Sequence, residues 1–315
     1  MAERPMVLVT TPLGSERRAP LLAEFDLTFE LDRRRGVRAL VVDGVFQVPA
    51  GILATFPDLE IIACIGTGYE SIDLDACARR GIAVTNTAGA NADAVADLTL
   101  GLILNLTRGI GEAERLLRAG LWRGDQPNRF FDAPGLTDRR VAIFGMGAIG
   151  RKIAQRLSGF DVRIAYGGPS QKVDLPYPYV ADLKALALWS DILVLAHRAD
   201  ESNRGIVDAR VLRALGATGH LINVSRGSAI AEEALIAALR DGTIAGAALD
   251  VFDTEPNIPS ARLDQSATVL TPHIGGGSSQ SFDRMFVALA ANLRAFFNGS
   301  PLPNPVLDRP TFQVP

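Results

Sequence analysis

The segment Arg140-Val-Ala-Ile-Phe-Gly145-Met-Gly147-Ala-Ile-Gly150 has the composition of a buried strand, a glycine turn and the start of a helix. Gly145 permits the turn, Gly147 lets the backbone approach a pyrophosphate, and Gly150 lets the helix pack closely on the strand. The first helical turn then offers free N–H groups and a positive dipole end to phosphates. A glycine turn alone is weak evidence, but the flanking strand and helix favour a dinucleotide site.

Short apolar runs alternate with helical patterns along the rest of the chain, which indicates an α/β fold. The runs are rich in Val, Ile, Leu and Ala without strict alternation, as is typical of parallel strands buried on both faces. We expect strands at 7–10, 38–42, 61–65, 82–85, 140–144, 162–166, 192–196, 220–224, 245–251 and 267–271. Helices are expected at 73–80, 92–107, 148–157, 209–215, 232–240 and 279–297.

Composition and charge exclude several classes of protein. The 315 residues predict about two domains, and 48% hydrophobic against 21% charged residues excludes intrinsic disorder. No apolar run approaches the roughly 18 residues of a membrane helix. The net charge of −3 favours no nucleic-acid partner. Cys64 and Cys77 have no histidine nearby, so we expect no metal site, no disulfide framework and a cytoplasmic location.

Ionisable side chains follow three of the expected strands at their carboxyl ends, where ligands of open α/β sheets bind. Arg226 follows the run 221–224, Asp253 and Glu255 follow 247–252, and His273 follows 268–272. His197 also follows a strand. The spacing alone does not choose between the two histidines or between the two carboxylates.

An arginine, a carboxylate and an imidazole on one rim would support hydride transfer to a 2-oxo acid. The guanidinium offers a planar fork to a carboxylate or a carbonyl. Histidine is the natural general acid near neutral pH, and a neighbouring carboxylate favours its charged form. Taken singly, an arginine or a glutamate after a strand is more often a solvated surface residue, and a lone histidine is more often structural.

The loop after the strand 162–166 bears on the choice of cofactor. An NAD site normally has Asp or Glu there to bind the ribose hydroxyls, whereas this loop reads Gly167-Gly-Pro-Ser-Gln-Lys172 and has no acid before Asp174. Ser170, Gln171 and Lys172 offer donors and a charge to a 2′-phosphate. We therefore expect NADP(H) to be preferred, with NAD(H) as the alternative, and expect Gly167→Asp to shift the preference toward NADH.

At this level of detail the chain resembles the D-isomer-specific 2-hydroxyacid dehydrogenases, close to the glyoxylate/hydroxypyruvate reductases. The matching stretches keep the family's order over about two thirds of the chain. They are Gly66-Thr-Gly-Tyr-Glu-Ser-Ile-Asp73, Gly81-Ile-Ala-Val-Thr-Asn86, Val95-Ala-Asp-Leu-Thr99, Phe144-Gly-Met-Gly-Ala-Ile-Gly150, Leu221-Ile-Asn-Val-Ser-Arg-Gly227, Ala248-Leu-Asp-Val-Phe-Asp-Thr-Glu-Pro256 and Thr271-Pro-His-Ile-Gly275.

The resemblance implies a role for individual residues. It makes Arg226 the substrate-binding arginine, His273 the general acid and Glu255 its orienting carboxylate, and it favours these residues over Asp253 and His197. The substrate contacts it implies are Thr67, Gly68, Arg226 and His273. With the glycine fingerprint, the cofactor contacts become Thr99, Gly145, Gly147, Ala148, Ile149, Gly150, Ser170, Gln171, Lys172, Val224, Asp250, His273 and Gly275.

The same resemblance implies two domains, each an open parallel sheet with helices on both faces. A flavodoxin-like substrate domain would comprise residues 1–99 and 289–315, completed by the C-terminal tail, and a Rossmann-type cofactor domain residues 100–288. Members of the family are typically homodimers, and the Ala119-Gly-Leu-Trp122 arm resembles part of that interface.

The expected activity is NAD(P)H-dependent reduction of a small 2-oxo acid, such as glyoxylate or hydroxypyruvate, to the D-2-hydroxy acid. Two alternatives stay open. One is the same chemistry on a bulkier acid such as an aryl pyruvate. The other is a non-enzymatic, dinucleotide-sensing regulator on the same fold, which the absence of a basic patch disfavours.

Overall fold

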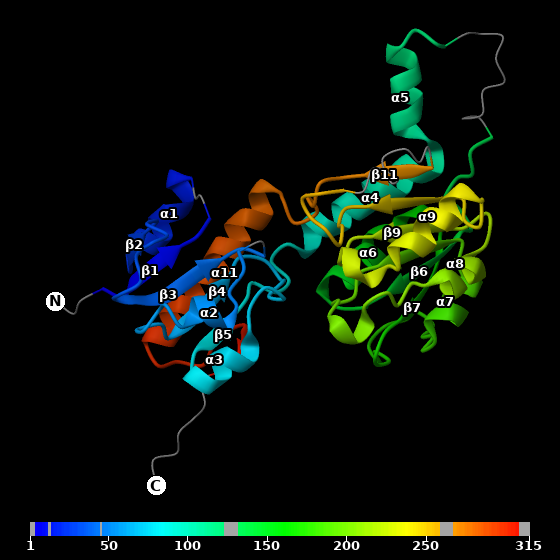
Figure 1. The fold of residues 1–315 in the computed structure, drawn as a ribbon. Coiled ribbons are helices and arrows are strands. Elements are labelled where there is room, and N and C mark those ends of the chain that lie inside the picture. Colours follow the sequence, from blue (N-terminus) through cyan, green and yellow to red (C-terminus); the bar gives the residue numbers. More distant parts are fainter. Residues whose placement is uncertain (1–3, 12–13, 45, 123–131, 259–266, 309–315) are drawn as a thin grey trace. The chain divides into compact units, whose positions relative to one another are not determined.

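The computed structural model describes residues 4–11, 14–44, 46–122, 132–258 and 267–308. The chain forms two compact units. Unit 1 comprises Met1–Asn91 and Gly277–Pro315, and unit 2 comprises Ala92–Gly276. Each unit is built on a six-stranded sheet with helices on both faces (Figure 1), which confirms the expected fold class.

Unit 1 has the strand order β12-β5-β4-β3-β1-β2, and its five strands other than β12 follow the flavodoxin-like order. All neighbours are parallel except β12, which runs antiparallel to β5. The elements are β1 (Met6–Val9), α1 (Ser15–Leu22), β2 (Asp26–Thr28), β3 (Val37–Val42), α2 (Ala50–Leu53), β4 (Ile61–Cys64), α3 (Leu74–Arg80), β5 (Ala83–Thr85), α11 (Ser279–Phe297) and β12 (Pro305–Leu307).

Unit 2 has the strand order β11-β10-β9-β8-β6-β7, and all its strands are parallel. Tyr179 bridges to Tyr166 on the outer edge of β7. When this bridge is counted as the third strand after β6 and β7, and β8, β9 and β10 as the fourth to sixth, the unit has the doubly wound order 3-2-1-4-5-6. The elements are α4 (Ala92–Arg108), α5 (Ile110–Arg118), β6 (Arg140–Phe144), α6 (Ala148–Leu157), β7 (Arg163–Gly167), α7 (Leu183–Trp189), β8 (Ile192–Leu195), α8 (Ala209–Leu215), β9 (His220–Asn223), α9 (Glu232–Arg240), β10 (Gly246–Leu249) and β11 (Thr268–Leu270).

Alternate residues of each unit 2 strand face opposite cores. In β8, Ile192 and Val194 pack under α4 and α6, whereas Leu193 and Leu195 pack under α7, α8 and α9. All four side chains are fully buried. Strands buried on both faces need apolar residues at every position, and this explains why their sequences do not alternate between apolar and polar residues.

Several elements of the structure were not expected from the sequence. Strands β2 and β12 are only three residues long, and helices α1, α2 and α7 are short. Short elements carry too few residues to show a period. The units divide the chain before α4 and before α11, whereas the expected domain limits at 99/100 and 288/289 fall inside these two helices.

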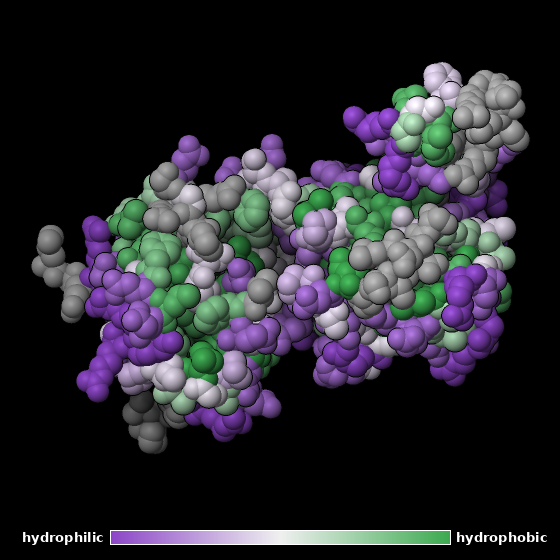
Figure 2. Space-filling model, turned by 45° about the horizontal axis from the view of Figure 1, so that its top comes forward, coloured by the Kyte–Doolittle hydropathy of each residue, from purple (hydrophilic) through white to green (hydrophobic). Residues whose placement is uncertain are grey.

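Helix α5 projects away from the sheet of unit 2 (Figure 1), and no described residue of this helix is buried. The α5 segment carries exposed apolar side chains next to charged ones (Figure 2). Leu117 is 58% exposed and Trp122, just beyond the helix, is 74% exposed.

Within the described ranges, no single helix is both long and apolar enough to cross a membrane. Helices α4 and α5 reach that length and apolarity only when taken together as a pair bent by 64°.

Candidate active site

The carboxyl ends of the unit 2 strands collect most of the residues expected at the site. Because β6 to β11 are parallel, the segments that follow them lie along the same edge of the sheet. Gly145 follows β6, Arg226 follows β9, Asp250 follows β10 and His273 follows β11. This edge is where open α/β sheets bind their ligands.

The three fingerprint glycines differ in what surrounds them. A Cβ atom on Gly145, which has a φ of +107°, would lie 2.3 Å from the backbone nitrogen of His197, and one on Gly150 would lie 2.1 Å from the Gly145 carbonyl oxygen. Gly147, in contrast, has no atom within 4 Å of its Cβ position. Two glycines therefore serve close packing, while the third leaves open space above the helix start.

The N-terminus of α6 fits a phosphate group. Gly147 and Ala148 are exposed and Ile149 is partly exposed, and no described side chain caps this end. The first N–H groups of a helix have no partner inside the helix and carry its positive dipole end. A pyrophosphate would supply the missing acceptors, so the residues present fit a dinucleotide.

Two tyrosine hydroxyl groups hold the loop that follows β7. The Tyr166 hydroxyl accepts a hydrogen bond from the Lys172 backbone N–H at 2.7 Å, and the Tyr179 hydroxyl donates to the Gly168 carbonyl at 2.8 Å. Lys172 Nζ donates to Ser170 Oγ at 3.0 Å, and both Ser170 and Gln171 are exposed. The three residues expected at a 2′-phosphate therefore share one short, ordered loop.

The surroundings of Gly167 bear on the Gly167→Asp substitution expected to test this loop. Gly167 is buried, and a Cβ atom there would lie 2.8 Å from Leu186 Cδ2 and 2.9 Å from the Val180 carbonyl oxygen. A side chain at Gly167 would force the Val180 backbone to shift, so Gly167→Asp is a poor test of this loop, and its expected effect on cofactor preference stays a prediction. Asp174, the first acid after β7, is bound by the Arg151 guanidinium in two hydrogen bonds.

His273 and Glu255 form a hydrogen-bonded pair. The distance from His273 Nδ1 to Glu255 Oε2 is 2.7 Å, and Glu255 Oε1 accepts from the Phe252 backbone N–H at 2.8 Å. Both carboxylate oxygens are therefore occupied. Since Nδ1 faces the carboxylate, Nε2 is the ring nitrogen left for proton transfer.

The pKa of Glu255 is lowered. Partial burial acts to raise it, but the hydrogen bonds from His273 and Phe252 and the positive charges of His273 and Arg226 outweigh this effect. Glu255 therefore stays ionised as the acceptor for His273 Nδ1. Asp253, the other carboxylate left open by the sequence, is bound by Arg204 instead.

A close backbone contact brings the Arg226 turn to the Glu255 segment. A Cβ atom on Gly227 would lie 2.0 Å from the carbonyl carbon of Phe252, so only glycine allows the two segments to touch. The buried Asn223 also fixes the turn, because its side chain donates to the Arg226 carbonyl at 2.8 Å. Asn223 was not singled out in the sequence, although a polar residue at the end of an apolar strand is a signal.

The buried Asp250 carboxylate orders the loop that carries His273. It accepts hydrogen bonds from the Ile274 N–H at 2.9 Å, the Gly275 N–H at 2.8 Å and the Thr271 hydroxyl at 2.6 Å. These contacts surround His273, whose own backbone has a φ of +51°. Asp250, which the resemblance places at the cofactor, thus forms hydrogen bonds that hold the His273 loop.

Two further residues expected at the cofactor are buried within unit 2. Thr99 is fully buried in α4, and its hydroxyl donates to the Val95 carbonyl at 2.7 Å. Val224 is 7% exposed and follows β9. Their contact with a cofactor stays a prediction.

The two remaining histidines have different surroundings from His273. His197 packs edge-on against Phe144, and neither of its ring nitrogens has a partner among the described residues. Burial lowers the pKa of His197 to about 4. Burial and the nearby Arg139 likewise lower the pKa of His220 to about 4. Both rings are neutral at pH 7.

Thr67 and Gly68, the remaining expected substrate contacts, lie in unit 1 in the loop that follows β4. Thr67 is exposed and Gly68 is partly exposed. They lie at the carboxyl ends of the unit 1 strands, where ligands of such sheets bind.

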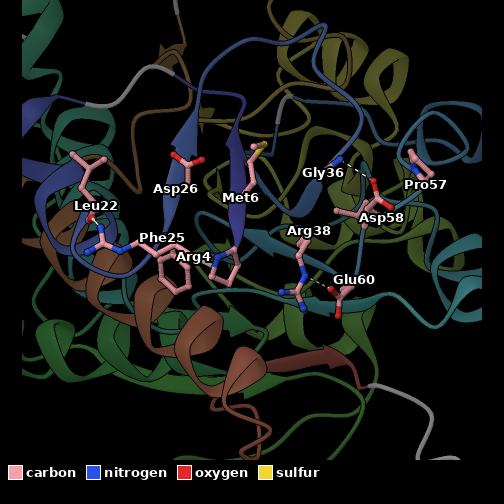
Figure 3. A pocket seen from close by; sticks show the side chains of 12 residues that line it. Arg4, Met6, Leu22, Phe25, Asp26, Gly36, Arg38, Pro57, Asp58 and Glu60 are labelled. Atoms are coloured by element: carbon pink, nitrogen blue, oxygen red, sulfur yellow. Dashed lines mark hydrogen bonds and ion pairs between the residues drawn. The ribbon is translucent and has the colours of Figure 1, made fainter. Parts of the chain in front are cut away.

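A cavity of unit 1 lies at the opposite, amino-terminal edge of its sheet. It has a volume of about 900 Å³ and is lined by Arg4, Pro5, Met6, Leu22, Phe25, Asp26, Gly36, Arg38, Pro57, Asp58, Leu59 and Glu60. Its polar groups largely bind one another, as Arg38 pairs with Glu60 and Asp58 accepts from the Gly36 N–H (Figure 3). This cavity is therefore a poor candidate for the reaction.

Comparison with known proteins identifies the family. Residues 100–275 match the NAD-binding domain of the D-isomer-specific 2-hydroxyacid dehydrogenases. A glyoxylate/hydroxypyruvate reductase of Arabidopsis thaliana is 40% identical over 271 residues, covering 85% of this chain and 83% of its own. A hydroxyphenylpyruvate reductase of Plectranthus scutellarioides is 37% identical, covering 86% of each chain.

A solved structure agrees with this assignment. The NADPH-dependent glyoxylate/hydroxypyruvate reductase of Sinorhizobium meliloti, crystallised with NADP and malonate, superposes with a TM-score of 0.88 at 37% identity. The match covers 96% of this chain and 97% of that one. The chain belongs to the D-isomer-specific 2-hydroxyacid dehydrogenase family and is an NAD(P)-dependent oxidoreductase that reduces a 2-oxo acid.

Proposed function

We propose that the enzyme reduces a small 2-oxo acid of the glyoxylate or hydroxypyruvate type to the D-2-hydroxy acid. The observation that carries this proposal is the His273–Glu255 pair beside Arg226, on the same sheet edge as the glycine fingerprint. The two relatives named glyoxylate/hydroxypyruvate reductase support the choice of substrate.

The proposed roles follow from the chemistry of each group. A nicotinamide dinucleotide bound at this edge supplies the hydride. Arg226 binds the substrate carboxylate and carbonyl through its planar fork. His273 donates the Nε2 proton to the carbonyl oxygen, and the ionised Glu255 stabilises the charged imidazole before transfer. The backbone N–H groups of Thr67 and Gly68 bind the substrate carboxylate.

A bulkier substrate is the second candidate. The hydroxyphenylpyruvate reductase of Plectranthus scutellarioides is nearly as similar to this chain as the glyoxylate/hydroxypyruvate reductases are. An aryl pyruvate has the same 2-oxo acid group, so the same three residues would act on it. The comparisons support either enzyme over a non-enzymatic regulator.

For the cofactor, we propose that NADPH is preferred over NADH. Ser170, Gln171 and Lys172 share an ordered loop after β7, and the nearest acid, Asp174, is neutralised by Arg151. A ribose-binding carboxylate, which would repel a 2′-phosphate, is missing from this loop. The Sinorhizobium meliloti relative is NADPH-dependent.

We also propose that two copies of the chain form a homodimer through α5 and the segment 119–122. Ile110, Leu117, Leu121 and Trp122 are 47% to 74% exposed on this projecting arm. Exposed apolar side chains gathered on one element are characteristic of a protein interface. The family resemblance indicates a second copy as the partner.

The first prediction concerns the general acid. The wild type should reduce glyoxylate and hydroxypyruvate more efficiently than phenylpyruvate. His273→Asn should lower kcat about 100-fold or more, because the proton donor is lost. Turnover is followed by nicotinamide absorbance. An unchanged circular dichroism spectrum serves as the control for folding. A folded His273→Asn enzyme with wild-type turnover would contradict the assignment.

The second prediction concerns the guanidinium fork. Arg226→Lys keeps the charge but loses the two-pronged geometry, so KM for glyoxylate should rise and kcat/KM should fall at least about tenfold. Arg210→Lys, at a surface ion pair with Asp208, is the matched control and should leave both constants unchanged. Equal efficiencies for the two variants would show that Arg226 does not contact the substrate.

The third prediction concerns the 2′-phosphate. Lys172→Gln removes a positive charge from the loop after β7, so KM for NADPH should rise about fivefold while KM for NADH stays the same. Lys184→Gln, on the exposed face of α7, is the matched control and should change neither value. A wild type that uses NADH as efficiently as NADPH would refute the proposed preference.

The fourth prediction concerns the arm. Leu117→Glu places a charge on the proposed interface and should convert the dimer to a monomer, as measured by light scattering after gel filtration. Leu188→Glu changes a leucine of similar exposure on α7 and should leave the dimer intact. The proposal fails if the wild type is a monomer or if both variants remain dimeric.

A further inference from the structure

The segment that follows β5 holds the Gly66–Gly68 loop through its carbonyl groups. The Gly66 carbonyl accepts from the Thr87 N–H at 2.9 Å and from the Thr87 hydroxyl at 3.1 Å. The Thr67 carbonyl accepts from the Asn86 side-chain amide at 2.9 Å. The Thr87 hydroxyl also accepts from the Gly66 N–H at 2.8 Å. Asn86 and Thr87 thus bind two successive carbonyl groups.

These bonds also set the direction of the next two N–H groups. A peptide group is planar and trans, so its C=O and N–H point in opposite directions. Fixing the Gly66 carbonyl therefore orients the Thr67 N–H, and fixing the Thr67 carbonyl orients the Gly68 N–H. Both N–H groups point away from Asn86 and Thr87. Neither has an acceptor among the residues described.

Asn86 and Thr87 are themselves held in place by burial and by further hydrogen bonds. Thr87 is fully buried and Asn86 is 6% exposed. The Asn86 carbonyl accepts from the side chain of Asn292, a fully buried residue of α11, at 2.8 Å. The Asn292 side-chain oxygen accepts from the Asn304 N–H at 3.1 Å, and the Asn304 carbonyl accepts from the Asn86 N–H at 3.2 Å. Buried amides that are fully paired are costly to break.

We infer that Asn86 and Thr87 are positioning residues for substrate binding. They orient the N–H groups of Thr67 and Gly68 toward the carboxylate of the 2-oxo acid. An arrangement set before binding gains affinity because the loop loses little entropy when the ligand arrives. This inference rests on the proposed function, in which the same two N–H groups bind the substrate carboxylate.

Two neighbouring threonines provide a matched test. Thr85 and Thr87 are both fully buried, but Thr85 Oγ1 has no partner among the described residues, whereas Thr87 Oγ1 binds Gly66. Valine has nearly the same shape as threonine and lacks the hydroxyl. Thr87→Val therefore removes the two hydroxyl contacts to Gly66 and keeps the backbone N–H bond, and Thr85→Val controls for the loss of a buried hydroxyl two residues earlier, in β5.

For each variant, oxamate binding, KM and kcat are measured with NADPH at saturation, and the Kd for NADPH is measured by a separate titration. Thr87→Val should weaken the binding of oxamate, a non-reactive carboxylate analogue, and raise KM for glyoxylate, each about tenfold. The kcat value should change much less, and the Kd for NADPH should stay within about twofold of the wild type. Thr85→Val should match the wild type in all four values, and Thr87→Ser, which keeps the hydroxyl, should restore binding.

A second variant covers the case in which Thr87→Val does not fold. Asn86→Ala removes the donor to the Thr67 carbonyl and should give the same selective rise in KM and in the Kd for oxamate. The inference is overturned if a folded Thr87→Val or Asn86→Ala enzyme binds oxamate as tightly as Thr85→Val does. A wild type that reduces no 2-oxo acid would instead overturn the proposed function.

Discussion

The parallel alignment of the six unit 2 strands is the constraint on which the candidate site depends. Hydrogen bonding between strands in one direction brings segments from residues 145 to 275 to a single edge. At this edge backbones meet closely without side chains between them, at Gly145 against His197 and at Gly227 against Phe252. A side chain at either glycine would separate segments that carry candidate site residues.

The three carboxylates at this edge each bind a different partner. Glu255 binds His273, Asp253 binds Arg204, and Asp250 binds the backbone of the loop that carries His273. A carboxylate that bound the wrong cation would leave the imidazole without its partner. Neutral His197 and His220, by contrast, lie where burial disfavours charge. Burial thus distinguishes these two uncharged rings from the exposed His273, the proposed general acid.

In unit 1, buried amide side chains hold the loop that follows β4. Asn86 and Asn292 connect the loop after β4, the segment after β5, helix α11 and the C-terminal tail through paired hydrogen bonds. These bonds fix backbone groups without placing a charge next to the loop. A loop proposed to bind a carboxylate benefits from such neutral supports, because a nearby acidic side chain would repel the ligand.

The sequence by itself determined the α/β class, most of the long strands and helices, the dinucleotide fingerprint and the placement of Arg226, Glu255 and His273 after strands. These follow from local composition and from spacing along the chain. It did not reveal strand β12, the supports at Asn86 and Thr87, or the lack of room at Gly167. Only the tertiary structure decided these features, because each depends on atoms far apart in the chain: β12 pairs with β5, Thr87 binds Gly66, and Gly167 lies against Leu186. Contacts of this kind have no period and leave no local pattern in the sequence.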